Sequence, residues 1–191
     1  MNNNIRSVLI SLLIIWQTTA LGATGIYAIM EGGWTNTTGL PQITQQNSFP
    51  AIRFGIGYLH DFNDMFGIGV EVDKGFFAKN QYYLNDGTQI NIKTTALEFL
   101  FITAIHWQEL EKIDLVMKVG GNRNATDING NENNRIQPVI GIDVGYNFTP
   151  HFAAIVNYTH YFGNSIHDFS DKNPKCPSIN AILAGLRITF W

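Results

Sequence analysis

The sequence predicts an all-β protein, an eight-stranded antiparallel up-and-down transmembrane β-barrel. Three observations support this prediction. Apolar residues alternate with small or polar ones along most of the chain, the connections between these segments sort into long and short ones, and aromatic residues lie beside the short connections. Alternation with a period of two is typical of strands, because successive side chains of a strand point to opposite faces.

Composition excludes several other classes of protein. The chain has 191 residues, which is the length of about one domain. Only 14% of its residues are charged, and its 12 Lys and Arg stand against 15 Asp and Glu without forming a basic cluster, so nucleic acid is not an expected partner. The single cysteine, Cys176, excludes an intrachain disulfide and a cysteine-based metal site.

The first 23 residues have the pattern of a secretory signal peptide. One positive charge, Arg6, precedes an apolar run from Val8 to Trp16, and small residues follow from Thr18 to Ala23. An N-terminal membrane anchor is the alternative, but the apolar run has about half of the roughly 20 residues that a spanning helix needs. We therefore expect a cleaved signal peptide at 1–23 and a barrel domain at 24–191.

The first half of this domain contains four expected strands. The facing of the first strand is ambiguous, because both Tyr27, Ile29 and Glu31 and the residues that alternate with them include apolar side chains that could form the apolar face. In the second strand, every other residue from Ile52 to Tyr58 is apolar, and the residues between them are Arg53, Gly55 and Gly57. The third strand continues this pattern. The fourth is long enough to extend beyond a membrane. The expected ranges are 25–36, 49–61, 65–77 and 88–107.

The second half adds four more strands with the same period. The alternation is clearest in the sixth, where Ile136, Ile140 and Val144 share a face opposite Val139 and Asp143. The eighth ends the chain on Phe190 and Trp191, as an aromatic girdle at a membrane surface requires. The expected ranges are 112–124, 135–148, 151–163 and 178–190.

The connections separate a membrane barrel from a soluble one. The odd-numbered connections are long and polar, and the even-numbered ones are short, so an up-and-down meander places all long connections at one end. The long ones are 37–48, 78–87, 122–134 and 163–177, and the short ones are 62–64, 108–111 and 149–150. A soluble lipocalin-like barrel shows the same alternation with its apolar face inward, but it has no reason to sort its connections.

Several segments resemble the corresponding parts of OmpA-type eight-stranded outer-membrane barrels. They are Arg53–Tyr58, Phe66–Glu71, Ile113–Gly121, Gly141–Pro150 and Gly185–Phe190. The resemblance implies an outer-membrane location in a Gram-negative cell envelope and recognition of the last strand by the barrel-assembly machinery. The assembly signal that it implies consists of Gly185, Leu186, Ile188, Phe190 and Trp191, although the family pattern ends on the phenylalanine.

A barrel of eight strands has an interior that side chains fill, so we expect the inward charges to pair across the lumen. The expected network contains Arg53, Glu71, Glu98, Lys118, Asp143 and Arg187, with Asp73 near its loop end. The cations Arg53, Lys118 and Arg187 are expected to pair with Glu71, Glu98 and Asp143. Alternatively, the same residues line a narrow, porin-like ion path of low conductance.

The expected function is envelope integrity and surface contact, without enzymatic activity, cofactor or metal. His160 and Asn164 faintly resemble a motif of PagL-type lipid A deacylases, but Phe162 occupies the position of the serine nucleophile, and phenylalanine cannot replace it. The histidines lack the spacing of a zinc site. Expected partners are outer-membrane lipid and lipopolysaccharide, the assembly machinery, and a surface ligand or host component bound by loops around Pro41 and in 122–134. The chain is expected to be a monomer.

Overall fold

A computed structural model describes residues 24–38, 48–83, 89–106, 112–128, 131–163 and 177–190. The predicted signal peptide and Trp191 lie outside these residues. Among the described residues, no helix is long and apolar enough to cross a membrane.

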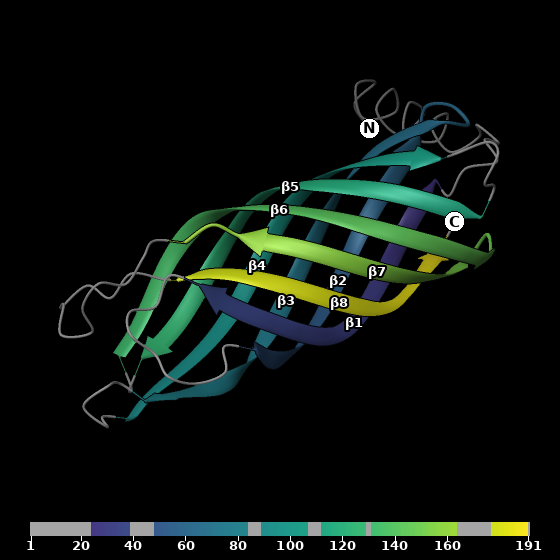
Figure 1. The fold of residues 1–191 in the computed structure, drawn as a ribbon. Helices are drawn as coiled ribbons and strands as arrows, with labels where there is room; N and C mark the ends of the chain where they lie inside the picture. The colour runs from purple at the N-terminus through teal and green to yellow at the C-terminus, as the bar shows by residue number, and fades with distance from the viewer. Residues whose placement is uncertain are drawn as a thin grey trace, which may run out of the picture.

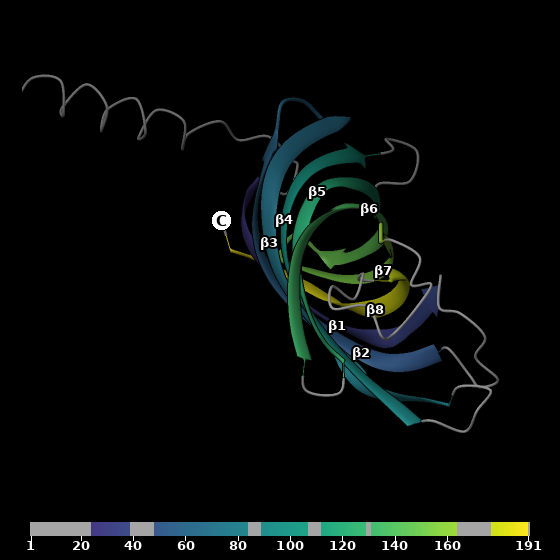
Figure 2. The ribbon, with the colours of Figure 1, turned by 90° about the vertical axis from the view of Figure 1, so that its left-hand side faces the viewer.

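Eight antiparallel strands form one closed barrel in which each strand pairs with its neighbour in the chain and β8 closes against β1. Figure 1 shows the strands running obliquely around the barrel, and Figure 2 shows them closing into a ring. The predicted fold class is therefore confirmed. The strands are β1 (Gly25–Thr38), β2 (Ser48–Asp61), β3 (Phe66–Tyr83), β4 (Gln89–His106), β5 (Ile113–Ile128), β6 (Asn131–Thr149), β7 (Phe152–Tyr161) and β8 (Ser178–Phe190).

The strand register makes the barrel strongly sheared. A row of paired residues that leaves β6 at Ile136 passes through every other strand and returns to β6 at Tyr146, ten residues further along the chain. In a closed barrel this stagger requires the strands to tilt by roughly 40° from the axis. Rows of paired residues therefore climb around the barrel, and residues far apart in the chain meet across the lumen.

The two faces of the barrel differ sharply in character. Outward side chains are mostly apolar and exposed, with Phe101 69% and Ile182 61% exposed. The inward positions of the same strands are buried and include many polar and charged residues. This parity is the predicted one for β2 to β6 and for β8. In β1, where the sequence left the facing open, Tyr27, Ile29 and Glu31 point inward.

The connections differ from the prediction at the long-connection end. β3 continues to Tyr83, and β5 and β6 are paired as far as Ile128 and Asn131, so only Asn129 and Gly130 separate these two strands. The expected long loop at 122–134 is therefore wrong. An Asn-Gly pair is a strong signal for a tight hairpin, because both residues tolerate the positive φ that its turn requires. Strands project at this end where loops were expected.

Adjacent glycines in β5 give a prediction about strand packing. A Cβ on Gly120 would lie 2.0 Å from the backbone oxygen of Phe99 on β4, whereas a Cβ on Gly121 would lie 3.8 Å from its nearest neighbour, the Gln137 oxygen. We expect Gly120→Ala to lower the free energy of unfolding by about 1–3 kcal/mol, because backbone must move to relieve the overlap. Gly121→Ala is the matched control and should change it little. Urea titration in lipid vesicles measures both, and equal effects would contradict the close approach.

Candidate functional site

The lumen holds the most distinctive chemistry of the molecule. Among the described residues, the buried ionisable side chains include seven carboxylates and three cations, Arg53, Lys118 and Arg187. Alternation places them inside, because each lies on the inward parity of its strand. All six residues of the predicted network are buried in the lumen, and so is Asp73.

Arg53 on β2 is the centre of the first group of charges. Its side chain is fully buried, its Nη2 lies 2.6 Å from Glu31 Oε2, and its Nε donates to the same oxygen at 2.6 Å. Two further acids lie at longer range, Glu98 at 3.7 Å from Nη1 and Asp73 at 3.8 Å from Nε. Arg53 therefore holds together carboxylates from β1, β3 and β4.

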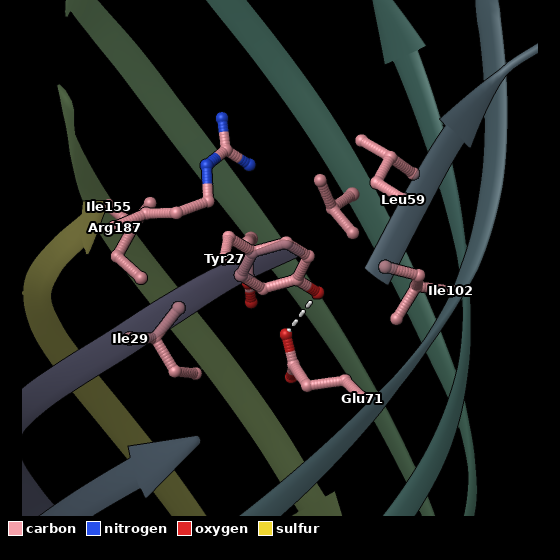
Figure 3. A pocket seen from close by; sticks show the side chains of 9 residues that line it. Tyr27, Ile29, Leu59, Glu71, Ile102, Ile155 and Arg187 are labelled. Atoms are coloured by element: carbon pink, nitrogen blue, oxygen red, sulfur yellow. Dashed lines mark hydrogen bonds between the residues drawn. The ribbon is translucent and has the colours of Figure 1, made fainter. Parts of the chain in front are cut away.

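Lys118 on β5 is the centre of the second group. Its Nζ lies 2.5 Å from Glu71 Oε1 and 2.8 Å from Asp143 Oδ2. The Tyr27 hydroxyl donates to the other oxygen of Glu71 at 2.6 Å, the contact drawn in Figure 3. Asn157 donates to Asp143 from the opposite side. Each hydrogen bond offsets part of the cost of burying these charges.

Hydroxyl and amide side chains of β7 connect the two groups. Arg53 Nη1 donates to Thr159 Oγ1 at 3.0 Å, and Thr159 donates to Asn157 Oδ1 at 2.7 Å. Tyr161, the next inward residue of β7, donates to Glu98 at 2.8 Å. Hydrogen bonds through Thr159 and Asn157 therefore connect the Arg53 and Lys118 groups, and Glu98 joins them through its 3.7 Å contact with Arg53.

A third group lies near the short-turn end around Arg187 on β8. Arg187 Nη2 lies 2.5 Å from Asp114 Oδ2 and donates to Asn147 at 3.2 Å. His106 bridges two acids, with Nδ1 at 2.8 Å from Asp114 and Nε2 at 3.1 Å from Asp61. Both ring nitrogens donate to carboxylates only when both carry a proton, so this geometry corresponds to a charged imidazolium.

Apolar side chains lie among the charged groups along the barrel axis. Between the Lys118 group and Arg187 lies a small cavity with room for about one water molecule. Figure 3 shows its apolar walls, which include Ile29, Leu59, Ile102 and Ile155. On the other side of the network, the rings of Phe77 and Tyr161 meet edge to face with centroids 5.5 Å apart. Apolar side chains thus lie on both sides of the central network, with Glu71, Asp143 and Arg187 also lining the small cavity.

The structure corrects part of the expected pairing. Lys118 contacts two of the expected acids, but the main partner of Arg53 is Glu31, and Arg187 pairs with Asp114 and not with Glu71, Glu98 or Asp143. Sequence reasoning missed Glu31 because the facing of its strand was ambiguous. Asp114 was missed as a partner although its inward parity was visible, because its contact with β8 depends on the stagger of the barrel.

Most other candidate residues that the structure describes lie on the outer face, whereas Gly185 of the expected assembly signal has the inward parity of β8. His160 is half-buried on the outward side of β7, where its Nδ1 lies 2.7 Å from Asn180 Oδ1 and its ring packs against Phe162. No group of His, Cys, Asp or Glu in the described ranges could hold a metal ion. Leu186, Ile188 and Phe190 point outward from β8, which pairs with β1.

Comparisons with solved structures identify the same fold in bacterial outer-membrane proteins. Neisserial surface protein A is similar over 87% of this chain and 98% of its own, with 17% identity and a TM-score of 0.55. The outer membrane protein OprG of Pseudomonas aeruginosa is similar over 90% of this chain and 99% of its own, with 11% identity and a TM-score of 0.49. The outer membrane enzyme PagL is similar over 86% of this chain and 99% of its own, with 13% identity and a TM-score of 0.47. This chain has the eight-stranded outer-membrane barrel fold. No protein-family model and no curated protein sequence matches the chain.

Proposed function

We propose that the chain is an integral protein of the bacterial outer membrane that crosses the bilayer with its eight strands. The apolar exposed face and the polar buried face support this, because a soluble barrel has the reverse arrangement. The aromatic residues Phe62, Phe66, Phe148 and Phe152 gather at the short-turn end, where they match an interfacial girdle. In this orientation the short turns face the periplasm and the long-connection end faces outward.

Within the membrane, we propose a closed barrel with a structural and surface-contact role. The observation that carries this proposal is the filled lumen, in which Arg53 and Lys118 form ion pairs with buried carboxylates and apolar side chains lie on both sides of them. Hydrophobic constrictions exclude water from narrow pores and so block ions. A filled interior is also what eight strands normally enclose. The protein then serves as a rigid scaffold for its outer end.

Surface contact is assigned to the outer end, because exposed segments on a rigid scaffold commonly carry binding. With the β5–β6 connection reduced to two residues, the contact surface that we propose consists of the projecting hairpins and the connections 39–47 and 164–176. Its partner is a surface ligand or host component. We also propose that β8 and the aromatic C-terminus are recognised by the barrel-assembly machinery.

Ion conductance across planar lipid bilayers tests the closed barrel. We expect the folded protein to give no sustained conductance steps, and Glu98→Gln to leave this unchanged. Phe77→Ala combined with Ile102→Ala should produce a measurable leak, because it removes apolar volume on both sides of the network. Discrete steps from the unaltered protein would contradict the closed barrel.

A narrow, low-conductance channel is the second candidate, and one observation favours it. Acids outnumber cations seven to three among the buried side chains of the described segments, so an open lumen would attract cations. Under this alternative, Glu98→Gln should change conductance strongly while the free energy of unfolding stays nearly constant. A lipid A-modifying activity has less support, because Phe162 provides no nucleophile beside His160.

A further inference from the structure

Three of the four charged side chains on the described outer face of the barrel are basic. Among strand residues whose exposure is described, the outward charged side chains are the cations Lys74, Lys93 and Arg123 and a single acid, Asp127. All of them lie on β3 to β5 and toward the long-connection end. Outward polar residues of β1 and β8 near the same end include the uncharged Asn36 and Asn180, so the basic band occupies one side of the barrel.

Register brings two of these cations close together. Lys74 on β3 pairs with Leu97 on β4, and Leu97 pairs with Arg123 on β5. Two strand spacings separate the backbones of Lys74 and Arg123 by about 10 Å, a gap that two long side chains can close around one anion. Leu97 lies between them, so the surface between the two cations is apolar.

Their height on the barrel corresponds to the border of the membrane. With strands tilted by roughly 40°, each residue rises about 2.5 Å along the axis, so Arg123 lies about 25 Å above Ile113, the first residue of β5. The apolar band of such barrels is about 25 Å tall. Lys74 starts slightly lower, and its Nζ lies 5.8 Å from the centroid of Phe76, the next outward residue toward the long-connection end. The lysine thus extends out of the apolar band.

We propose that Lys74 and Arg123 bind a phosphate group of an outer-leaflet lipid on the outer face of β3 to β5. This site rests on the proposed membrane location and orientation. Arginine can donate two parallel hydrogen bonds to phosphate, and lysine adds a point charge. Below Leu97, the next two outward side chains of β4 are Phe99 and Phe101, which are 58% and 69% exposed. A lipid held by its phosphate at the border would lay its acyl chains along these two rings.

Lipid binding to the intact folded barrel in neutral detergent micelles tests this site. Native mass spectrometry counts bound molecules of bisphosphorylated lipid A, of the same lipid with both phosphates removed, and of phosphatidylcholine. We expect the unaltered protein to prefer the phosphorylated form, and Lys74→Gln combined with Arg123→Gln to weaken its binding roughly tenfold or more. Arg123→Lys should retain most of the affinity.

Lys112→Gln is the matched control, because it removes an exposed lysine at the opposite end of β5. It should leave the preference unchanged. If the unaltered protein binds phosphorylated and dephosphorylated lipid A equally well, this result alone overturns the proposal. Equal binding by Lys112→Gln and by the combined Lys74→Gln and Arg123→Gln variant would overturn it as well. Conductance should not respond to these substitutions, so failure of this site and failure of the closed barrel are distinguishable.

Discussion

Replacing Arg53 with methionine should lower the free energy of unfolding by about 3–5 kcal/mol, the usual cost of removing one partner from a buried ion pair. Arg53 is fully buried and lies within 4 Å of three carboxylates, those of Glu31, Asp73 and Glu98. Methionine fills part of the space but leaves these carboxylates without their shared cation. The loss in unfolding free energy comes mainly from buried negative charge that neither water nor a counter-charge stabilises.

Reversible urea titration in lipid vesicles measures the effect. Arg123→Met is the control, because Arg123 is exposed on the outer face and the substitution should change stability by no more than about 0.5 kcal/mol in neutral lipid. Adding Glu31→Gln to Arg53→Met should recover part of the loss, since one unpaired charge is gone. A small loss with no recovery would mean that water enters the lumen, and the closed barrel would then be wrong.

Alternation divided the residues of most strands into two faces, and the sorted connections, which favour a membrane barrel, indicated which of the two faces the lumen. A strand has only two faces, so one apolar and one polar set fix the facing of every residue, as Ile140 outside and Asp143 inside illustrate. The ambiguous strand shows the limit of this rule. In β1 both sets contain apolar residues, and only its pairing with β2 and β8 determines that Glu31 faces Arg53.

Partners across the lumen could not be predicted, because they depend on the stagger of the closed barrel. Arg187 meets Asp114, which lies on β5 and pairs with no residue of β8 in the sheet. Alternation gives the face of each residue but no height along the axis relative to a distant strand. The six predicted charges therefore lie in the lumen, while two of the three cations have a principal partner outside the predicted set.

The last prediction concerns the outer face of the barrel. Replacing Ile142 with arginine should cost about 2–4 kcal/mol in unfolding free energy, because the charge would face hydrocarbon near the middle of the bilayer. Ile142 is 39% exposed on β6 and pairs with Met117 and Tyr158, both outward side chains. No inward acid can reach it, since the strand backbone lies between.

Ala125→Arg is the matched control for depth. Ala125 also points outward, but it lies on β5 two residues above Arg123, beyond the proposed membrane border, where arginine should cost about 0–1 kcal/mol. Folding titrations of both variants in the same vesicles give the difference. Equal costs would mean that both positions meet the same solvent, and the proposed membrane placement would fail. A large cost at Ile142 alone supports a bilayer centred on the middle of the strands, because only a layered solvent distinguishes two outward positions by height.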